Sequence, residues 1–473
     1  MKTKSKFSKS FLMFFFLIIY FLHGCSNIEY KEKRIQIKEI TSHLKQINYQ
    51  DSNFIQYLIK NGYPKSELPF SSWGLNELIH AQQFFNPKLK TGKINWELAK
   101  TNEVIASLRP LTSLGIKVGK SDGDGQLSDK IFDTSFSFTF EPANKRLIRH
   151  EIALNKTQLS LIEREMLHWQ LREDLLDCLF RFINNQDSRN TVRDELHLKQ
   201  SILSMIKKRL DLGVVSQVDY DRQTLNLNQV DNELFELQIK QSELKKELAS
   251  HIGLSIEQFN LIPIKTKDIT IIVSKKVNNY LQNTNKIKLE NMALLNRVDL
   301  RHQLAIYAIT EANLKLEIAE QYPDITFSPA YAYDFGNQVW ALGIDTLIKT
   351  SDRNKAFITR AEKLRESEAS KIFSIQLNML NEVEVLLLTH TINKETLDTA
   401  QSNLKIKAGL IKKLQTRFDI GIIDRLDLER EKINLVNIDK DYHKAIYNFI
   451  RTGLKAEKIL QNRIFSPNIK FNL

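Results

Sequence analysis

The side chains best suited to chemistry in this sequence are two cysteines, Cys25 and Cys178, and ten histidines scattered along 473 residues. No group of Cys and His has the spacing of a metal site. The sequence also has no His-Glu-x-x-His motif and no glycine-rich phosphate-binding loop. These absences predict a protein that is not an enzyme and that needs no cofactor or metal.

Cys25 follows what reads as an export signal. Four lysines come first, and the twelve residues Phe11–Leu22 then carry no charge, whereas a membrane-spanning helix needs about 20 apolar residues. The run ends in Leu22-His23-Gly24-Cys25, which resembles the lipobox of bacterial lipoproteins. We therefore expect residues 1–24 to be removed and Cys25 to carry diacylglycerol and a further acyl chain, enough for stable anchoring. The resemblance also implies that Ser26, a residue other than Asp after the cysteine, permits sorting to the outer membrane.

Cys178 is predicted to be a small buried apolar residue, since it lies in Leu175-Leu176-Asp177-Cys178-Leu179-Phe180. With Cys25 lipidated, no disulfide within the chain is possible. The formal net charge is +12, and removal of the four lysines in residues 1–24 leaves +8. This basic balance does not indicate nucleic-acid binding, because an exported and lipidated protein does not meet nucleic acid.

Two glycines, Gly213 and Gly421, stand in the same motif. Residues 209–219 and 417–427 both read Arg-x-Asp-x-Gly followed by five residues and Asp, at a constant offset of 208. Glycine permits the positive φ that ends a helix, and Ser216 and Asp424 suit the N-cap of a returning helix. The sequence therefore predicts an internal duplication in which each repeat holds a long helix, a tight turn and an antiparallel return.

The helices before these turns are predicted to be very long, over 145–212 and 355–420. Leucine, isoleucine and phenylalanine recur seven residues apart in the second, at Leu397, Leu404, Ile411 and Phe418, which is the spacing of a coiled-coil seam. Each helix would extend about 100 Å at 1.5 Å per residue. Such lengths are typical of a tube or a rod.

A possible β-hairpin precedes each long helix, over 111–140 and 324–347. In both, large apolar residues alternate with small or polar ones, as in Phe132, Phe136 and Phe138 against Asp133, Ser135 and Ser137. This pattern suits strands between lipid and an aqueous lumen, although an ordinary hairpin packed on a helix remains an alternative. Four strands cannot close a barrel, and lipid does not tolerate an open edge. A membrane barrel would therefore need several copies of the chain.

The order of these elements resembles the TolC-like outer-membrane factors. Asn86-Pro87-Lys88-Leu89 matches that family's Asn-Pro-x-Leu, and Asn296-Arg297-Val298-Asp299-Leu300-Arg301 is similar to its Arg-Pro-Asp-Leu-Arg, with Val298 in place of Pro. Residues 247–254 resemble the usual end of the returning helix. The two turns resemble Tyr-x-x-Gly-x-x-Ser-x-x-Asp. The resemblance covers roughly residues 75–460.

This resemblance implies a mainly α fold with a small β part. Long antiparallel coiled-coil helices would form a periplasmic tunnel, and four strands per chain would enter a homotrimeric, twelve-stranded outer-membrane barrel. The Gly213 and Gly421 turns would form the periplasmic tips, which meet an adaptor linked to an inner-membrane transporter. A lipidated N-terminus favours efflux with a resistance-nodulation-division pump over protein secretion. The sequence does not identify the cargo.

The resemblance also places candidates for the aperture. Asp219 and Asp427 fall on the family's aperture acids, and threefold symmetry would present each three times, as a ring that favours cations. Clustered acids would raise one another's pKa. The alternative is that both are exposed charges near a helix N-terminus. Phe418 replaces a tyrosine of the family's second turn, and we expect Arg417 and Arg425 to pair with neighbouring acids instead.

The chain is therefore expected to begin with an export signal, 1–24, and an N-terminal segment, 25–74. Two repeats follow, 75–254 and 288–460, with a linker, 255–287, between them at the level of an equatorial belt. A tail, 461–473, ends the chain. The return helices are expected over 214–252 and 424–460. Two functions remain open at this point. One is an outer-membrane exit duct, and the other is a non-conducting, structural coiled-coil lipoprotein, which would have no use for the hairpins.

Overall fold

The computed structural model describes residues 29–120, 130–266 and 269–466. They belong to two units, Met1–Gln46 and Ile47–Leu473. In the first unit, helix α2, Ile37–Gln46, exposes Ile37, Ile40 and Leu44. The expected export signal and Cys25 lie outside the described residues.

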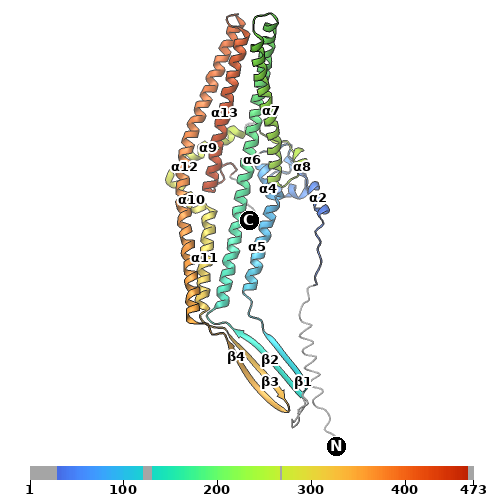
Figure 1. Ribbon diagram of the computed structural model, residues 1–473, viewed down its shortest axis with the longest axis vertical. Helices are drawn as coiled ribbons and strands as arrows, with labels where there is room; N and C mark the ends of the chain where they lie inside the picture. Colours follow the sequence, from blue (N-terminus) through green and yellow to red (C-terminus); the bar gives the residue numbers. More distant parts are fainter. Residues whose placement is uncertain (1–28, 121–129, 267–268, 467–473) are drawn as a thin grey trace. The chain divides into compact units, whose positions relative to one another are not determined.

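Four helices form the frame of the second unit (Figure 1). The long ones are α6, Lys145–Asp211, and α12, Ser351–Asp419, and they return as α7, Gln217–Ile252, and α13, Arg425–Leu460. Each long helix packs against its return helix, and α6 also packs against α13. The sevenfold seam faces inward, with Leu397 buried and Leu404, Ile411 and Phe418 half-buried. The predicted mainly α architecture of long helices is confirmed.

Each long helix is accompanied by two shorter helices in succession. Along α6, helix α5, Pro87–Ala106, packs in the half nearer the sheet and α7 in the other half (Figure 1). Along α12 the corresponding helices are α11, Val298–Ala319, and α13. The two repeats thus share one plan: a long helix covered first by one helix and then by another.

The points where one short helix gives way to the next are built alike. The Asn86 side chain donates a hydrogen bond to the His251 carbonyl at 2.8 Å, and Asn296 donates one to the Leu460 carbonyl at 3.4 Å. Helix C-termini leave carbonyls without partners inside the helix, and an amide from the neighbouring chain segment satisfies one in each repeat. Gly253, at φ +95°, is needed here because a Cβ would lie 2.6 Å from the Phe85 carbonyl oxygen.

The main apolar core surrounds these points. The middle parts of α6 and α12 share this core with helices α3, Ser52–Lys60, α4, Leu75–Phe85, and α10, Lys286–Asn296. The 3-10 helix η1, Lys65–Glu67, buries no side chain. The expected linker 255–287 holds helices α8, Ile256–Asn260, and α9, Ile269–Gln282, with Phe259 and Val277 fully buried. The described end of the tail buries Phe465 in the same core.

The strands form a single antiparallel sheet in the order β1-β2-β3-β4. Their bounds are Ser113–Lys120, Lys130–Phe140, Ile325–Asp334 and Asn337–Thr346. The sheet lies at the end of the long helices opposite the two turns (Figure 1). The expected four-stranded β part is therefore present, and its two hairpins, one from each repeat, pair through β2 and β3.

Candidate functional site

The sheet has two faces of opposite character. Its register places Ile116 beside Thr134, Phe138 beside Phe327, and Tyr331 beside Trp340, so the large residues of all four strands share one face. Several are exposed, and the exposed fraction reaches 77% for Val118 and 80% for Trp340. An exposed apolar face of this size marks a site of contact with lipid or with another protein.

The opposite face carries small and polar side chains. Ser137 and Ser328 lie 2.9 Å apart between their hydroxyl oxygens, and so do Thr139 and Thr326. Lys117 lies 3.7 Å from Asp133. Cross-strand pairs of this kind stabilise a sheet surface in contact with water.

The two outer strands, β1 and β4, each pair on one side only within the described residues. Inside the sheet, the register between β2 and β3 leaves out Ser328 and Pro329, and proline has no backbone N–H to donate. The Ser137–Ser328 hydrogen bond bridges the sheet at this place. Within the described residues the outer edges of β1 and β4 have no partner strand, so their backbone groups are open to further strands.

A buried lysine joins the sheet to the helices. Lys145, the first residue of α6, is 1% exposed, and its Nζ lies 2.7 Å from Asp324 Oδ1 and 3.7 Å from Glu320 Oε2. Asp324 directly precedes β3 in the other repeat. The ion pair therefore fixes the start of one repeat's long helix against the strand entry of the other.

At the far end of the helices, the two turns have the same backbone structure. Gly213 and Gly421 have φ of +70° and +78°. The N–H of Val214 donates to the Arg209 carbonyl at 2.8 Å, and that of Ile422 donates to the Arg417 carbonyl at 2.9 Å. These are Schellman ends, in which a positive-φ residue closes the helix. The two turns expose Leu212, Val214, Ile420 and Ile422.

The acids of the turns have different surroundings. Ser216 caps α7, and Asp219 Oδ2 accepts hydrogen bonds from the Ser216 hydroxyl at 2.7 Å and from its N–H at 3.3 Å. These bonds hold the pKa of Asp219 below its ordinary value. Asp427 lies 3.8 Å from Arg430 and has no such cap. Asp424 occupies the N-cap of α13, and its carboxylate pairs with Arg209.

The expected partners of Arg417 and Arg425 are not found. In the described part of the chain neither arginine forms an ion pair. The acids of the second turn pair with other cations, Asp424 with Arg209 and Asp427 with Arg430. The reason is geometric: Arg209 ends the neighbouring helix α6, so it reaches Asp424 across the two repeats, whereas Arg417 and Arg425 are exposed. Phe418 is half-buried at the end of the α12 seam.

Helix α12 exposes much apolar surface. One window of it has a mean hydropathy of 1.2 and is 17% buried, which by length and composition alone would suit a membrane-crossing helix. Its exposed residues include Phe373, Leu377, Val385 and Leu388. The same helix carries the coiled-coil seam and ends in the Gly421 turn. This exposed surface therefore favours contact with a further helix over a membrane crossing.

No protein-family model and no curated protein matches the chain. Solved structures do match. The outer membrane protein VceC from Vibrio cholerae is 15% identical, with a TM-score of 0.63, and the match covers 82% of this chain and 95% of that one. The Campylobacter jejuni CmeC outer membrane channel is 13% identical, with a TM-score of 0.64 and coverage of 94% and 95%.

A third match is the Neisseria gonorrhoeae MtrE outer membrane channel in its open state. It is 15% identical, with a TM-score of 0.60 and coverage of 82% and 88%. The three matches cover between 82% and 94% of this chain. The chain therefore has the fold of the TolC-like outer-membrane factors.

Proposed function

We propose that three copies of this chain form the outer-membrane channel of a tripartite efflux or secretion system, a passive exit duct. The observation that carries the proposal is the sheet. It has an apolar face and a polar face, neither covered by described residues of the second unit, and two unpaired edges. Closing it against further copies would give each backbone group a partner, which lipid requires, and would enclose the polar face as a lumen.

The helices suit the periplasmic part of such a duct. Helix α6 has 67 residues and α12 has 69, so each is about 100 Å long. The exposed apolar surface of α12 supports contact with a neighbouring copy. In a trimer, twelve strands and twelve helices of the kinds α6, α7, α12 and α13 would line one continuous passage.

The exposed apolar residues of the two turns support a docking site for a periplasmic adaptor. Leu212, Val214, Ile420 and Ile422 are each 65% exposed or more. Exposed aliphatic residues gathered at one end of a molecule mark an interaction surface. A passive duct has no energy source of its own, so an inner-membrane transporter would supply it through the adaptor. Cys25 would place the lipid anchor beside the barrel in the outer membrane.

Adjacent residues of β4 offer a direct test. Leu342 lies on the apolar face and Ala341 on the polar face. A lysine on the lipid side of a membrane strand costs about 2–4 kcal/mol near the midplane, whereas lumen substitutions tune selectivity. We expect Leu342→Lys to abolish the heat-sensitive trimer on gels. Ala341→Lys should assemble and shift ion selectivity in planar bilayers.

The competing function is a non-conducting coiled-coil lipoprotein. It predicts that the two lysine variants behave alike and that the purified wild type, with or without boiling, migrates as a monomer. A wild-type protein found only as a monomer in detergent would refute the trimeric duct. The faces and edges of the sheet favour the duct, because a rod would leave an apolar sheet face in water.

A further inference from the structure

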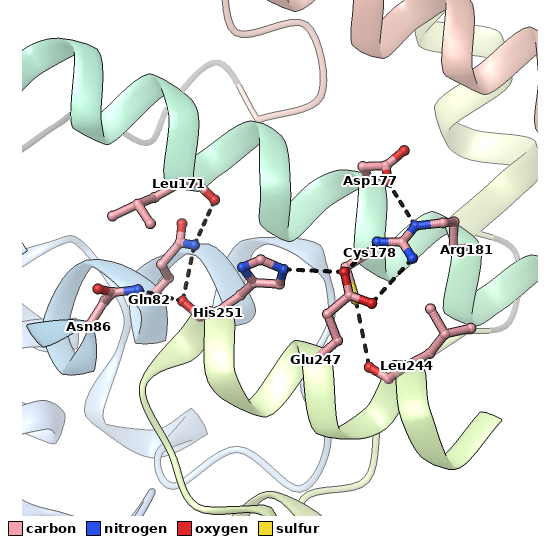
Figure 2. Close-up of polar contacts among 9 residues, drawn as sticks. All are labelled: Gln82, Asn86, Leu171, Asp177, Cys178, Arg181, Leu244, Glu247 and His251. Atoms are coloured by element: carbon pink, nitrogen blue, oxygen red, sulfur yellow. Dashed lines mark hydrogen bonds and ion pairs between the residues drawn. The ribbon is translucent and has the colours of Figure 1, made fainter. Parts of the chain in front are cut away.

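Three side chains with metal-binding atoms meet between α6 and α7. They are Cys178 of α6 and Glu247 and His251 of α7, and their ligand atoms all lie within 4.8 Å of one another. Figure 2 shows the thiol, the carboxylate and the imidazole pointing toward one another. Cys178 is fully buried, and the other two are half-buried.

The fold fixes the backbone on both sides of this cluster. Glu247 and His251 are four residues apart, so they share one face of α7. The end of α7 is held by Gln82 and Asn86, whose side-chain amides donate to the His251 carbonyl at 3.2 and 2.8 Å. Gln82 also donates to the Leu171 carbonyl of α6 at 2.7 Å (Figure 2). Both helices that supply ligands are therefore tied to α4.

The carboxylate is already oriented. Arg181 donates to Glu247 Oε1 at 2.6 Å and to Oε2 at 3.2 Å, while its Nε donates to Asp177 at 2.8 Å. His251 Nε2 lies 3.6 Å from Glu247 Oε1. A cation at Oε1 would leave the bond from Arg181 to Oε2 in place. Outer partners of this kind orient metal ligands.

We propose that Cys178, Glu247 and His251 form a binding site for Zn²⁺. Thiolate, imidazole and carboxylate are all zinc ligands, and sites with three protein ligands keep a fourth position for water. An adjoining cavity of about 380 Å³, lined in part by Asp177, Arg181, Glu247 and His251, would supply that water. The site would join α6 to α7 at the level of the main core.

The required movement is small. Bonds of about 2.0–2.3 Å to zinc place tetrahedral ligand atoms about 3.3–3.7 Å apart. The histidine-to-carboxylate distance of 3.6 Å already meets this. The thiol lies within 4.8 Å of both other ligand atoms, so it must approach by about an ångström at most. It would leave the Leu244 carbonyl oxygen, which it contacts at 3.6 Å.

Binding replaces a proton by the metal. The S–H bond of Cys178 breaks, a sulfur–zinc bond forms, and the proton leaves to solvent through the cavity. Burial raises the pKa of this thiol to about 12, so without metal it is neutral. The charged groups facing the site from α6 and α13 are mixed in sign: Glu173, Asp174, Asp177, Arg181, Arg451, Lys455 and Lys458.

The test uses the full-length protein in detergent and Co²⁺ as the probe. A thiolate bound to Co²⁺ gives a charge-transfer absorption that carboxylate and imidazole alone do not give. We expect wild type to show this absorption at one equivalent and to lose it when Zn²⁺ is added. Cys178→Ser and Cys178→Ala should abolish it, and His251→Gln and Glu247→Gln should weaken Zn²⁺ binding about tenfold or more.

His443→Gln is the matched control. His443 also lies four residues after an acid, Asp439, with 3.5 Å between Nε2 and Oδ2, but no cysteine of the described segments completes a ligand group with it. Its replacement should leave the cobalt spectrum unchanged. Circular dichroism of each metal-free variant checks that the helices persist. Absence of the absorption in wild type, or its persistence in either folded Cys178 variant, would overturn the site, whether or not the protein conducts.

Discussion

The guanidinium of Arg209, at the end of α6, pairs with the carboxylate of Asp424, the N-cap of α13. This contact joins the turn of the first repeat to that of the second. Hydrogen bonding from Arg209 is the largest cause of the lowered pKa of Asp424. Both side chains are more than one third exposed, so the pair contributes little to stability. Its effect would lie in how the two turns move.

Breaking this pair should loosen the turns and raise the mean conductance of the proposed duct. Asp424→Asn removes the charge and keeps the side-chain shape, and single-channel recording in planar bilayers measures the result. Asp419→Asn is the control, since Asp419 accepts a hydrogen bond from Gln415 and pairs with no cation among the described residues. The exchange Arg209→Asp with Asp424→Arg should restore wild-type conductance. Equal conductance of Asp424→Asn and wild type would contradict the role.

The same pair predicts a pH dependence. The pKa of Asp424 is lowered in the folded chain, so the pair's contribution is fully present above the ordinary carboxyl pKa and is lost as pH falls through the lowered value. Conductance should therefore be constant between about pH 5 and 8 and rise only in stronger acid. A rise centred near neutral pH would point to another group.

The two aperture acids, Asp219 and Asp427, should differ in how strongly they bind divalent cations. Both acids have an arginine at 3.8 Å, Arg222 beside Asp219 and Arg430 beside Asp427. Among the described residues, Asp219 is in addition hydrogen-bonded to Ser216 by the capping box. We expect Asp427→Ala to reduce block by divalent cations more than Asp219→Ala does, because the hydrogen bonds from Ser216 already occupy Oδ2 of Asp219. Bilayer recordings with Mg²⁺ titrated into the bath compare the two. If neither variant changes the block or the conductance, these acids do not form the gate.

Much of this fold follows from local sequence patterns. Alternation predicts the strands with both of their faces, and Gly213 and Gly421 predict the turns, because positive φ is a property of one residue. The helix seam likewise repeats within a few turns. What local patterns cannot give is which residues meet across repeats. Arg209 and Asp424 are 215 residues apart. Local patterns suggested Arg417 and Arg425 as the paired cations and did not reveal Arg209.

The Cys178 cluster was missed in the same way. Glu247 and His251 are visible as a helical pair, but Cys178 lies 66 residues before Leu244, the residue whose carbonyl it faces. The sequence shows only that Cys178 is apolar in context, and its burial confirms that prediction. Helices α8 and α9 were hidden in the expected linker because short helices gain their stability from tertiary packing.

Gly409 within α12 and Gly421 just after it allow the effect of backbone conformation on stability to be measured apart from the effect of side-chain packing. A Cβ at Gly409 or at Gly421 would meet nothing within 4 Å. Gly409 lies within a helix, so Gly409→Ala should raise the free energy of unfolding of the protein by about 0.5–1 kcal/mol. Gly421 has φ +78°, so Gly421→Ala should destabilise by about 1 kcal/mol. Thermal unfolding of the two variants should shift in opposite directions, and a shift in the same direction would contradict the turn geometry.

Lys145 should be critical for joining the sheet to the helices. Its Nζ is buried against Asp324 and Glu320, whose side chains are 42% and 32% exposed. Removing one partner of a fully buried ion pair lowers the free energy of unfolding by about 3–5 kcal/mol. Because the two acids are half-exposed, we expect Lys145→Met to lower it by about 2–3 kcal/mol. Lys315→Met, which breaks an exposed pair with Glu151, should leave thermal unfolding unchanged. Equal unfolding temperatures for both variants would show that the buried pair has no special role.

Cys25→Ala should impair delivery or assembly more than conduction. A membrane barrel would hold the chain by its strands, so the acyl chains would add a second attachment whose main effect is sorting. Membrane fractionation measures delivery, the heat-sensitive gel band measures assembly, and bilayer recording measures conduction. The control is Ser26→Ala, which keeps the cysteine. We expect less Cys25→Ala protein in the outer membrane but normal conductance per assembled trimer. A correctly sorted and fully assembled Cys25→Ala trimer that fails to conduct would show that the lipid acts on the duct itself.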